Sequence, residues 1–262
     1  MNFCVLFRKA LSWLARLTAK LAAKWHPHLV LKSDVPTFTF CEDGLATVHN
    51  SEFLVNERFQ RAYSLGKQTG SWHNHDLRWR IHVLLWCATW AAQCSGAFVE
   101  CGVYRGGFAR AIIDYINFES LNKTYYLFDT FAGFDHSQFN ESERRTIASN
   151  YHYEDTFNAV RQEFSSMTSV RLVRGSIPES LVDVGSVAFL SIDMNCVVPE
   201  IAAAKFYWPH MSPGAVMVLD DYGFTIHHQQ KLAFDQLAKE WNVEILSLPT
   251  GQGLIFKPGM SA

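Results

Sequence analysis

From Phe98 onward, short apolar runs alternate with longer segments in which apolar residues recur at helical spacing. Short apolar runs are typical of buried strands, and amphipathic segments are typical of the helices that cover them. The expected strands are AFVEC, TYYLFD, SVRLV, VAFLSID and AVMVLDD, and the expected helices are GFARAIIDYINF, YEDTFNAVRQEF, PEIAAAKFYW and IHHQQKLAFDQLAKEW. The tail segments VEILSLP and GQGLIFKP indicate an antiparallel pair at the sheet edge. This alternation predicts an α/β fold with a Rossmann-like, doubly wound and mostly parallel sheet.

The segment before Phe98 follows a different pattern. TFTFCEDGLATV alternates apolar residues around a Glu-Asp-Gly turn and predicts a hairpin. SEFLVNERFQRAYSLG predicts a helix that begins at a Ser cap and ends at Gly66. NHDLRWRIHVLLWCATWAAQC predicts another helix, and the stripe that we expect to face the core contains Trp79, Val83, Trp86 and Trp90.

The first 33 residues are basic, with no acidic residue before Asp34. Their leucines and aromatic residues recur at helical spacing, which predicts a basic amphipathic helix. Residues 1–25 either lie on an anionic membrane surface or pack on the body of the protein or on a second subunit. We divide the chain into an N-terminal extension, residues 1–70, made of a helix, a hairpin and a second helix, and a main domain, residues 71–262.

Composition narrows the function classes. The 262 residues carry a formal net charge of −2 and are 48% hydrophobic and 18% charged, which is the balance of a globular protein. A near-neutral chain lacks the basic excess that nucleic-acid binding requires. The six cysteines are scattered without a CxxC pair, which favours reduced thiols and a cytoplasmic protein, with peripheral contact at the inner membrane surface as the alternative.

The stretch FVECGVYRGG joins the first strand of the main domain to its helix. Gly102 and Gly107 match the outer positions of a dinucleotide fingerprint, but Tyr104 occupies the middle position. The middle glycine allows the backbone to approach a pyrophosphate, so Tyr104 argues against NAD or FAD. Backbone N–H groups at a helix start suit a carboxylate. A ligand with an amino-acid end and a nucleoside end fits this turn, and S-adenosylmethionine is such a ligand.

Acidic residues follow several of the predicted strands. Asp129 ends the second strand, where an acid typically accepts both hydroxyls of a ribose, and Ser176 follows the third strand beside the expected adenine. Asp193, Asp220 and Asp221 end the next two strands and should converge on one sheet edge. Converging carboxylates repel one another, and oxygen ligands without Cys or His favour Mg²⁺. The alternative is that one acid caps a helix and another meets an arginine such as Arg105.

Five segments together resemble the macrocin O-methyltransferase family (TylF/MycF-like): FVECGVYRGG, LFDTFAGF, LSIDMN, SPGAVMVLDDYG and LPTGQGLI. The resemblance covers roughly residues 58–258. It implies a class I methyltransferase that uses S-adenosylmethionine and Mg²⁺ to methylate sugar hydroxyls of natural products. It also implies that Asp193, Asp220 and Asp221 bind the metal and that Asp193 helps to deprotonate the substrate. The better-known members carry I-D-G-D where this chain has IDMN, so Asn195 replaces the second acid.

Order in the fold and the resemblance together indicate a set of cofactor contacts: Glu100, Cys101, Gly102, Tyr104, Arg105, Gly106, Asp129, Thr130, Phe131, Gly175, Ser176 and Asp193. His227 and His228 are either an alternative base or residues at the surface of a helix start. The segment from Thr130 to about Asn150 is a long strand-to-helix loop, and loops of this length are usually either lids or disordered.

Three other functions stay open at this point. The same fold and metal site also suit a catechol-type or phenol O-methyltransferase. The replacement by Asn195 also fits a methyltransferase fold that binds without turnover. The basic N-terminal segment also fits a membrane-attached enzyme that modifies glycolipids or polysaccharides. The expected partner is a small-molecule or glycan acceptor, and the segment before Phe53 is a candidate arm for a homo-oligomer.

Overall fold

The computed structural model describes residues 38–147 and 153–259. A seven-stranded sheet has the strand order β5-β4-β3-β6-β7-β9-β8. The predicted strands are confirmed, and the antiparallel pair lies at one edge. The bounds are β3 Ala97–Cys101, β4 Tyr125–Asp129, β5 Val170–Arg174, β6 Val187–Ile192, β7 Met211–Leu219, β8 Leu246–Ser247 and β9 Gly253–Phe256.

The sheet is doubly wound about β3. Going from β3 to β4 and then to β5, the chain moves outward, and it then returns to place β6 on the other side of β3. Both neighbours run parallel to β3, whereas β9 runs antiparallel to β7. The direction of winding therefore reverses between β3 and β6. Ligands of open α/β sheets bind at such a point, outside the carboxyl ends of the strands.

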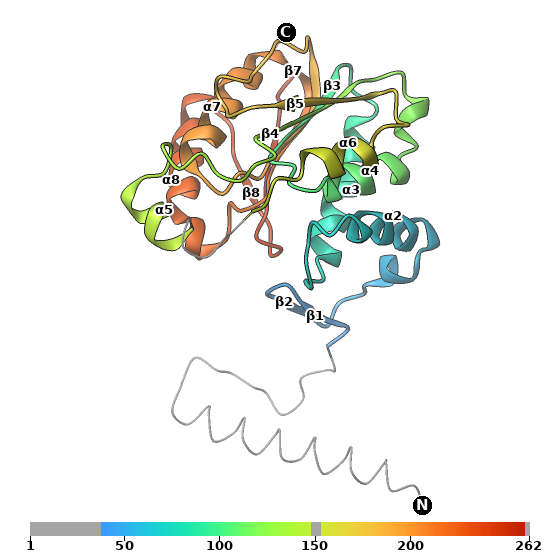
Figure 1. Cartoon of the computed structure of the whole chain (residues 1–262). Coiled ribbons are helices and arrows are strands. Elements are labelled where there is room, and N and C mark those ends of the chain that lie inside the picture. Colours follow the sequence, from blue (N-terminus) through green and yellow to red (C-terminus); the bar gives the residue numbers. More distant parts are fainter. Residues whose placement is uncertain (1–37, 148–152, 260–262) are drawn as a thin grey trace, which may run out of the picture. The chain divides into compact units, whose positions relative to one another are not determined.

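Helices cover both faces of the sheet (Figure 1). One core packs α2 (Glu57–Gln68), α3 (Arg78–Ala91) and α4 (Gly107–Tyr115) against one face. The other core packs α7 (Val197–Tyr207) and α8 (His228–Glu240) against the opposite face. Because the central strands are buried on both faces, β3 and β6 consist almost entirely of apolar residues.

The prediction of which side of helix α3 faces the core is wrong for its two C-terminal tryptophans. Trp86 is 52% exposed and Trp90 is 44% exposed, and their rings stack on each other at the surface. Helix α3 instead turns Ile81 and Leu84 inward, together with its buried alanines and Cys87. The helix is apolar on nearly all sides, so its periodicity alone does not specify which side faces the sheet.

Two other element boundaries differ from expectation. Helix α2 begins at Glu57, because the side chain of Asn56 accepts the N–H of Phe59 and caps it. The preceding residues Glu52–Val55 form a separate 3₁₀ turn. The expected lid segment contains a short helix, α5 (Glu141–Thr146), with a capping box at Asn140.

The predicted hairpin is confirmed as β1 (Phe40–Glu42) and β2 (Leu45–Thr47). Its turn, Glu42–Leu45, belongs with residues 51–262 to one compact unit. Helix α2 packs against α4 within that unit, and the boundary at residue 70 stays a prediction. The expected amphipathic helix of residues 1–25 lies outside the described residues. No helix in the described ranges has the length and apolar composition to cross a membrane.

Candidate active site

A cavity of about 470 Å³ lies at the carboxyl ends of the central strands, where the winding reverses. Three predicted cofactor residues, Cys101, Arg105 and Gly106, do not line it. The other nine do: Glu100, Gly102, Tyr104, Asp129, Thr130, Phe131, Gly175, Ser176 and Asp193. The cavity size is within the usual range for small-molecule sites.

The glycine turn is held in place by Asp129. Its Oδ2 accepts the backbone N–H groups of Val103 at 2.7 Å and Tyr104 at 2.8 Å, and its Oδ1 accepts the N–H of Phe131 at 2.6 Å. Two N–H groups that we expected to bind a ligand carboxylate therefore donate to the Asp129 carboxylate instead. Oδ1 also accepts the Thr130 hydroxyl at 3.3 Å, so Asp129 joins the ends of β3 and β4 at the border of the cavity.

The loop after β4 contributes polar groups that the sequence did not reveal. Gln138 donates from Nε2 to Ser176 Oγ at 3.1 Å, and Ser176 Oγ donates to Asp135 Oδ2 at 2.9 Å. All three side chains line the cavity beside Gly175. Gln138 and Asp135 come from the segment that we predicted to be a lid, but no sequence signal distinguished them from other loop residues.

Asp193, Asp220 and Asp221 offer ligand oxygens that all lie within 4.8 Å of one another. Burial, followed by the charges of Asp220 and Asp221, raises the pKa of Asp193 well above its usual value. Burial and the charge of Asp220 raise the pKa of Asp221 to about 7. Oδ2 of Asp221 is buried without a hydrogen-bond partner. Clustered carboxylate oxygens with an unused buried lone pair fit a hard divalent cation.

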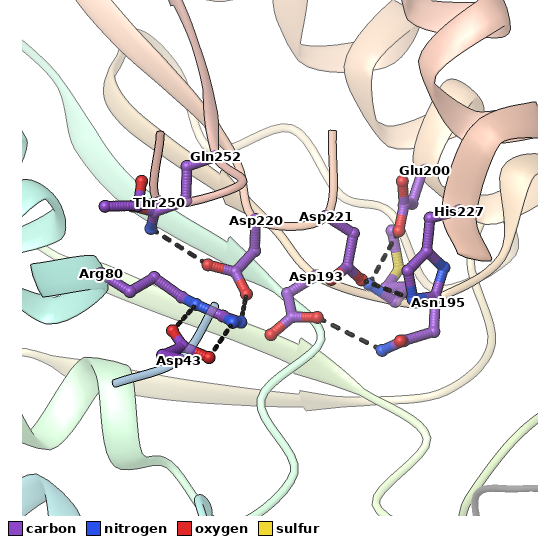
Figure 2. Close-up of polar contacts among 11 residues, drawn as sticks. Asp43, Arg80, Asp193, Asn195, Glu200, Asp220, Asp221, His227, Thr250 and Gln252 are labelled. Carbon is purple, nitrogen blue, oxygen red and sulfur yellow. Dashed lines mark hydrogen bonds and ion pairs between the residues drawn. The ribbon is translucent and has the colours of Figure 1, made fainter. Parts of the chain in front are cut away.

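Arginine does reach the acidic cluster, but it is Arg80 rather than Arg105. Nη1 of Arg80 donates to Asp220 Oδ2 at 2.8 Å (Figure 2). Arg105 pairs with Glu154 instead. Burial opposes the charge of Arg80, but the Asp220 and Asp43 carboxylates outweigh it and raise its pKa. No sequence pattern signals this contact, because its partners are far apart along the chain.

A polar network lies behind the other side of the cluster (Figure 2). Glu200 is buried and accepts the N–H of Met194 at 3.0 Å and Nε2 of Gln230 at 2.6 Å. Asn195 donates from Nδ2 to Asp193 Oδ1 at 3.3 Å. His227 is buried outside the cavity, with Nε2 3.7 Å from Asp221 Oδ2, and burial lowers its pKa. His228 is exposed, so neither histidine lies where a base would meet a substrate.

Comparison with known families identifies the chain. The profile of the macrocin O-methyltransferase (TylF) family matches residues 80–244, more than half of the sequence. The protein belongs to the TylF family. It is therefore an S-adenosylmethionine-dependent O-methyltransferase, and the resemblance seen in the sequence is confirmed.

Solved structures show the same fold. The O-methyltransferase NovP superposes with a TM-score of 0.65 at 15% identity, covering 80% of this chain and all of NovP. The S-adenosylhomocysteine-bound methyltransferase PaMTH1 of Podospora anserina superposes with a TM-score of 0.53 at 13% identity, covering 87% of this chain and all of PaMTH1. At these identities the likeness shows the fold alone. A search of curated proteins found no match.

Glu100 makes stability depend on pH in this TylF-family protein. Burial is the main cause that raises its pKa to about 8, although the Tyr125 hydroxyl donates to Glu100 Oε2 at 2.8 Å. The folded state thus binds a proton that the unfolded chain releases near its usual pKa. This contribution to stability is complete below that lower pKa and is lost as the pH rises to about 8.

We therefore expect Glu100→Gln to raise the melting temperature by several degrees at about pH 8.5 and to change it little at about pH 5. Thermal unfolding followed by circular dichroism measures both. Glu179→Gln, at an exposed position, is the control and should show no such pH dependence. Equal destabilisation of Glu100→Gln at both pH values would contradict this assignment.

Proposed function

We propose that this enzyme transfers the methyl group of S-adenosylmethionine to a sugar hydroxyl of a small molecule or glycoconjugate, with a divalent cation at its acidic cluster. The observation that carries the proposal is the convergence of Asp193, Asp220 and Asp221 on the cavity beside the Gly102 turn. The glycine turn follows β3, and Asp193 follows the adjacent strand β6, so donor and acceptor would meet between them.

The binding roles follow from position. Asp129 fixes the glycine turn at the cavity border where the ribose would lie, while Ser176 lies at the adenine side. Glu100, Gly102, Tyr104, Thr130, Phe131 and Gly175 complete the cavity wall for the methyl donor. Cys101 and Gly106 hold the turn through their backbones, because the Cys101 carbonyl accepts the N–H of Asp193 and the Gly106 N–H donates to the Val103 carbonyl. Arg105 pairs with Glu154 instead.

Asp193 is the proposed base. It lies at the end of β6 and borders the cavity, and its carboxylate accepts the proton of the acceptor hydroxyl at hydrogen-bond distance. The acceptor oxygen then bonds to the methyl carbon as the carbon–sulfur bond of the donor breaks. A bound divalent cation would offset repulsion among the carboxylates and make a coordinated hydroxyl more acidic.

One part of the cavity lining favours a hydroxyl-rich acceptor over a flat phenol. It carries the charged groups Asp43 and Arg80, the imidazole of His75, and Phe224, whose ring lies 4.7 Å from the Arg80 guanidinium carbon. Arg80 and Asp43 are paired with each other, but the Asp43 carboxylate and the His75 imidazole can still form hydrogen bonds that an apolar ring would leave unused. Sugar hydroxyls both donate and accept, so they satisfy such groups.

Titration calorimetry with S-adenosylhomocysteine tests the methyl-donor site. We expect micromolar binding by the full chain and a loss of about 100-fold in Asp129→Asn, because an amide cannot accept all three backbone N–H groups as a carboxylate does. Asp114→Asn removes a carboxylate that pairs with Arg61 and does not line the cavity, and it serves as the control. Absence of binding by the unmodified protein would overturn the assignment of this cavity to the methyl donor.

A radiolabelled methyl donor tests the acceptor. The panel contains glycosides with vicinal hydroxyls on one side and catechol and simple phenols on the other. We expect transfer to a glycoside that stops with EDTA and returns with Mg²⁺. Transfer to catechol alone would replace the sugar acceptor with a phenolic one, and transfer that persists in EDTA would remove the cation from the proposal.

A further inference from the structure

Gln138 lies beside the turn that follows β5, although it comes from the loop that follows β4. Its Nε2 donates to Ser176 Oγ at 3.1 Å and to the carbonyl of Ile177. All three residues line the cavity, and we call the part that they line the β5 corner. Two segments that are separate in the sequence therefore meet at this corner and are joined there by hydrogen bonds.

The direction of each of these hydrogen bonds is fixed by its partners. Hydrogen bonds from Ser137 and Ser176 lower the pKa of Asp135, so this carboxylate is ionised near neutral pH and only accepts. Ser176 gives its one hydroxyl hydrogen to Asp135 Oδ2 at 2.9 Å, so it can only accept from Gln138. The Ile177 carbonyl also only accepts. Both partners therefore require the amide nitrogen of Gln138, and not its oxygen, on the side of the β5 turn.

The amide oxygen of Gln138 is left without a donor. Both hydrogens on Nε2 are used, and no group in the described part of the chain donates to Oε1. The side chain is half-buried at the border of the cavity, and the described residues do not enclose Oε1, so a ligand can reach it. The β5 corner thus offers one unused acceptor on an amide whose orientation is set.

The loop that carries Gln138 is also anchored through other contacts. The Gln138 carbonyl accepts the thiol of Cys196 at 3.6 Å. Glu143 of α5 is buried, and its Oε1 accepts the N–H of Val197, the first residue of α7, at 2.8 Å. Its Oε2 accepts the N–H of Asn140 at 2.9 Å. Because these contacts tie the loop to the start of α7, the position of Gln138 does not depend on its own amide alone.

The order of the strands indicates which part of the methyl donor meets this corner. Strands β3, β4 and β5 are neighbours in the sheet, and residues at their carboxyl ends line one cavity. With the amino-acid end of the donor at Gly102 after β3 and the ribose at Asp129 on β4, the base continues to the β5 corner. Ile177 and Phe139 are each only 4% exposed and give this corner apolar surface for a flat ring.

We propose that Gln138 determines the base specificity of the donor site, because its amide oxygen accepts the exocyclic N6 amino group of adenine. Ser176 and Asp135 are positioning residues that hold the amide in this orientation. The inference rests on the proposed placement of the methyl donor in this cavity. Adenine supplies the missing donor at N6, whereas a purine without the amino group leaves the acceptor unpaired.

Titration calorimetry with the full chain compares two ligands that differ by one amino group. They are S-adenosylhomocysteine and its analogue with purine in place of adenine, which keeps N1, the ribose and the amino-acid end. We expect the unmodified protein to bind S-adenosylhomocysteine about 30-fold more tightly than the analogue. A ratio below about threefold would overturn the inference alone. Absence of S-adenosylhomocysteine binding would overturn the placement of the donor and the inference with it.

Gln138→Ala tests the residue. We expect the ratio to fall to about threefold or less, because S-adenosylhomocysteine loses its acceptor while the affinity for the purine analogue changes little. General damage to the site would weaken both ligands alike and keep the ratio, and that outcome would overturn the role of Gln138. Gln162→Ala is the matched control, at an exposed position outside the cavity, and should keep the ratio of the unmodified protein.

Ser176→Ala tests the positioning. It removes one of the two acceptors that hold the Gln138 amide nitrogen but leaves Oε1 in place, so we expect a ratio of about tenfold, between the other two. An unchanged ratio would overturn the positioning role of Ser176 and Asp135. Circular dichroism establishes that each variant is folded.

Discussion

Asp193→Asn is expected to lower the rate of methyl transfer by about 10³-fold, the range in which a positioned base contributes. The amide has nearly the same shape as the carboxylate, but it cannot take the proton of the acceptor hydroxyl. Asp193 borders the cavity at the end of β6, and its N–H donates to the Cys101 carbonyl at 2.9 Å, so its backbone stays fixed. The rate is measured with a radiolabelled donor and the acceptor that the panel identifies.

The affinity for S-adenosylhomocysteine separates this effect from misfolding. We expect it to change by less than about threefold in Asp193→Asn, because most of the proposed donor contacts follow β3, β4 and β5. Asp183→Asn, at an exposed position, is the control and should retain both properties. A variant Asp193→Asn that keeps near-full turnover would remove Asp193 from the role of base.

Gly102→Ala is expected to lower the free energy of unfolding by about 4 kcal/mol. Gly102 has a φ of +92°, and a Cβ at this position would lie 1.8 Å from the backbone oxygen of Asp193. That oxygen cannot retreat, because the Asp193 backbone is hydrogen-bonded to the end of β3. The strain of the positive φ and the steric overlap therefore add at Gly102, where the turn after β3 meets the backbone of Asp193. Urea denaturation measures the loss.

Gly185→Ala separates the two causes. Gly185 also has a positive φ, +73°, but no atom lies within 4 Å of its added Cβ. We expect this variant to lose only about 1 kcal/mol, the cost of the backbone conformation alone. Similar losses for Gly185→Ala and Gly102→Ala would show that the close approach to Asp193 relaxes at little cost.

The sequence by itself determined the sheet, its mostly parallel winding and the edge at which its acidic residues gather. Buried parallel strands are continuous apolar runs, and their polar ends are visible as the first charged residues after each run. The positions of Asp193, Asp220 and Asp221 at such run ends are therefore enough to assign all three to one sheet edge. The FVECGVYRGG turn likewise argued against a dinucleotide, because Tyr104 stands where the middle glycine allows the backbone to approach a pyrophosphate.

The tertiary structure alone decided what surrounds those residues. The exposure of Trp86 and Trp90 depends on which side of α3 meets the sheet, and a helix that is apolar all round does not encode that choice. The contact from Arg80 to Asp220 joins residues 140 positions apart, and that from Arg80 to Asp43 reaches back to a hairpin turn. Local patterns report the periodicity of one element, whereas such ion pairs arise only when elements pack.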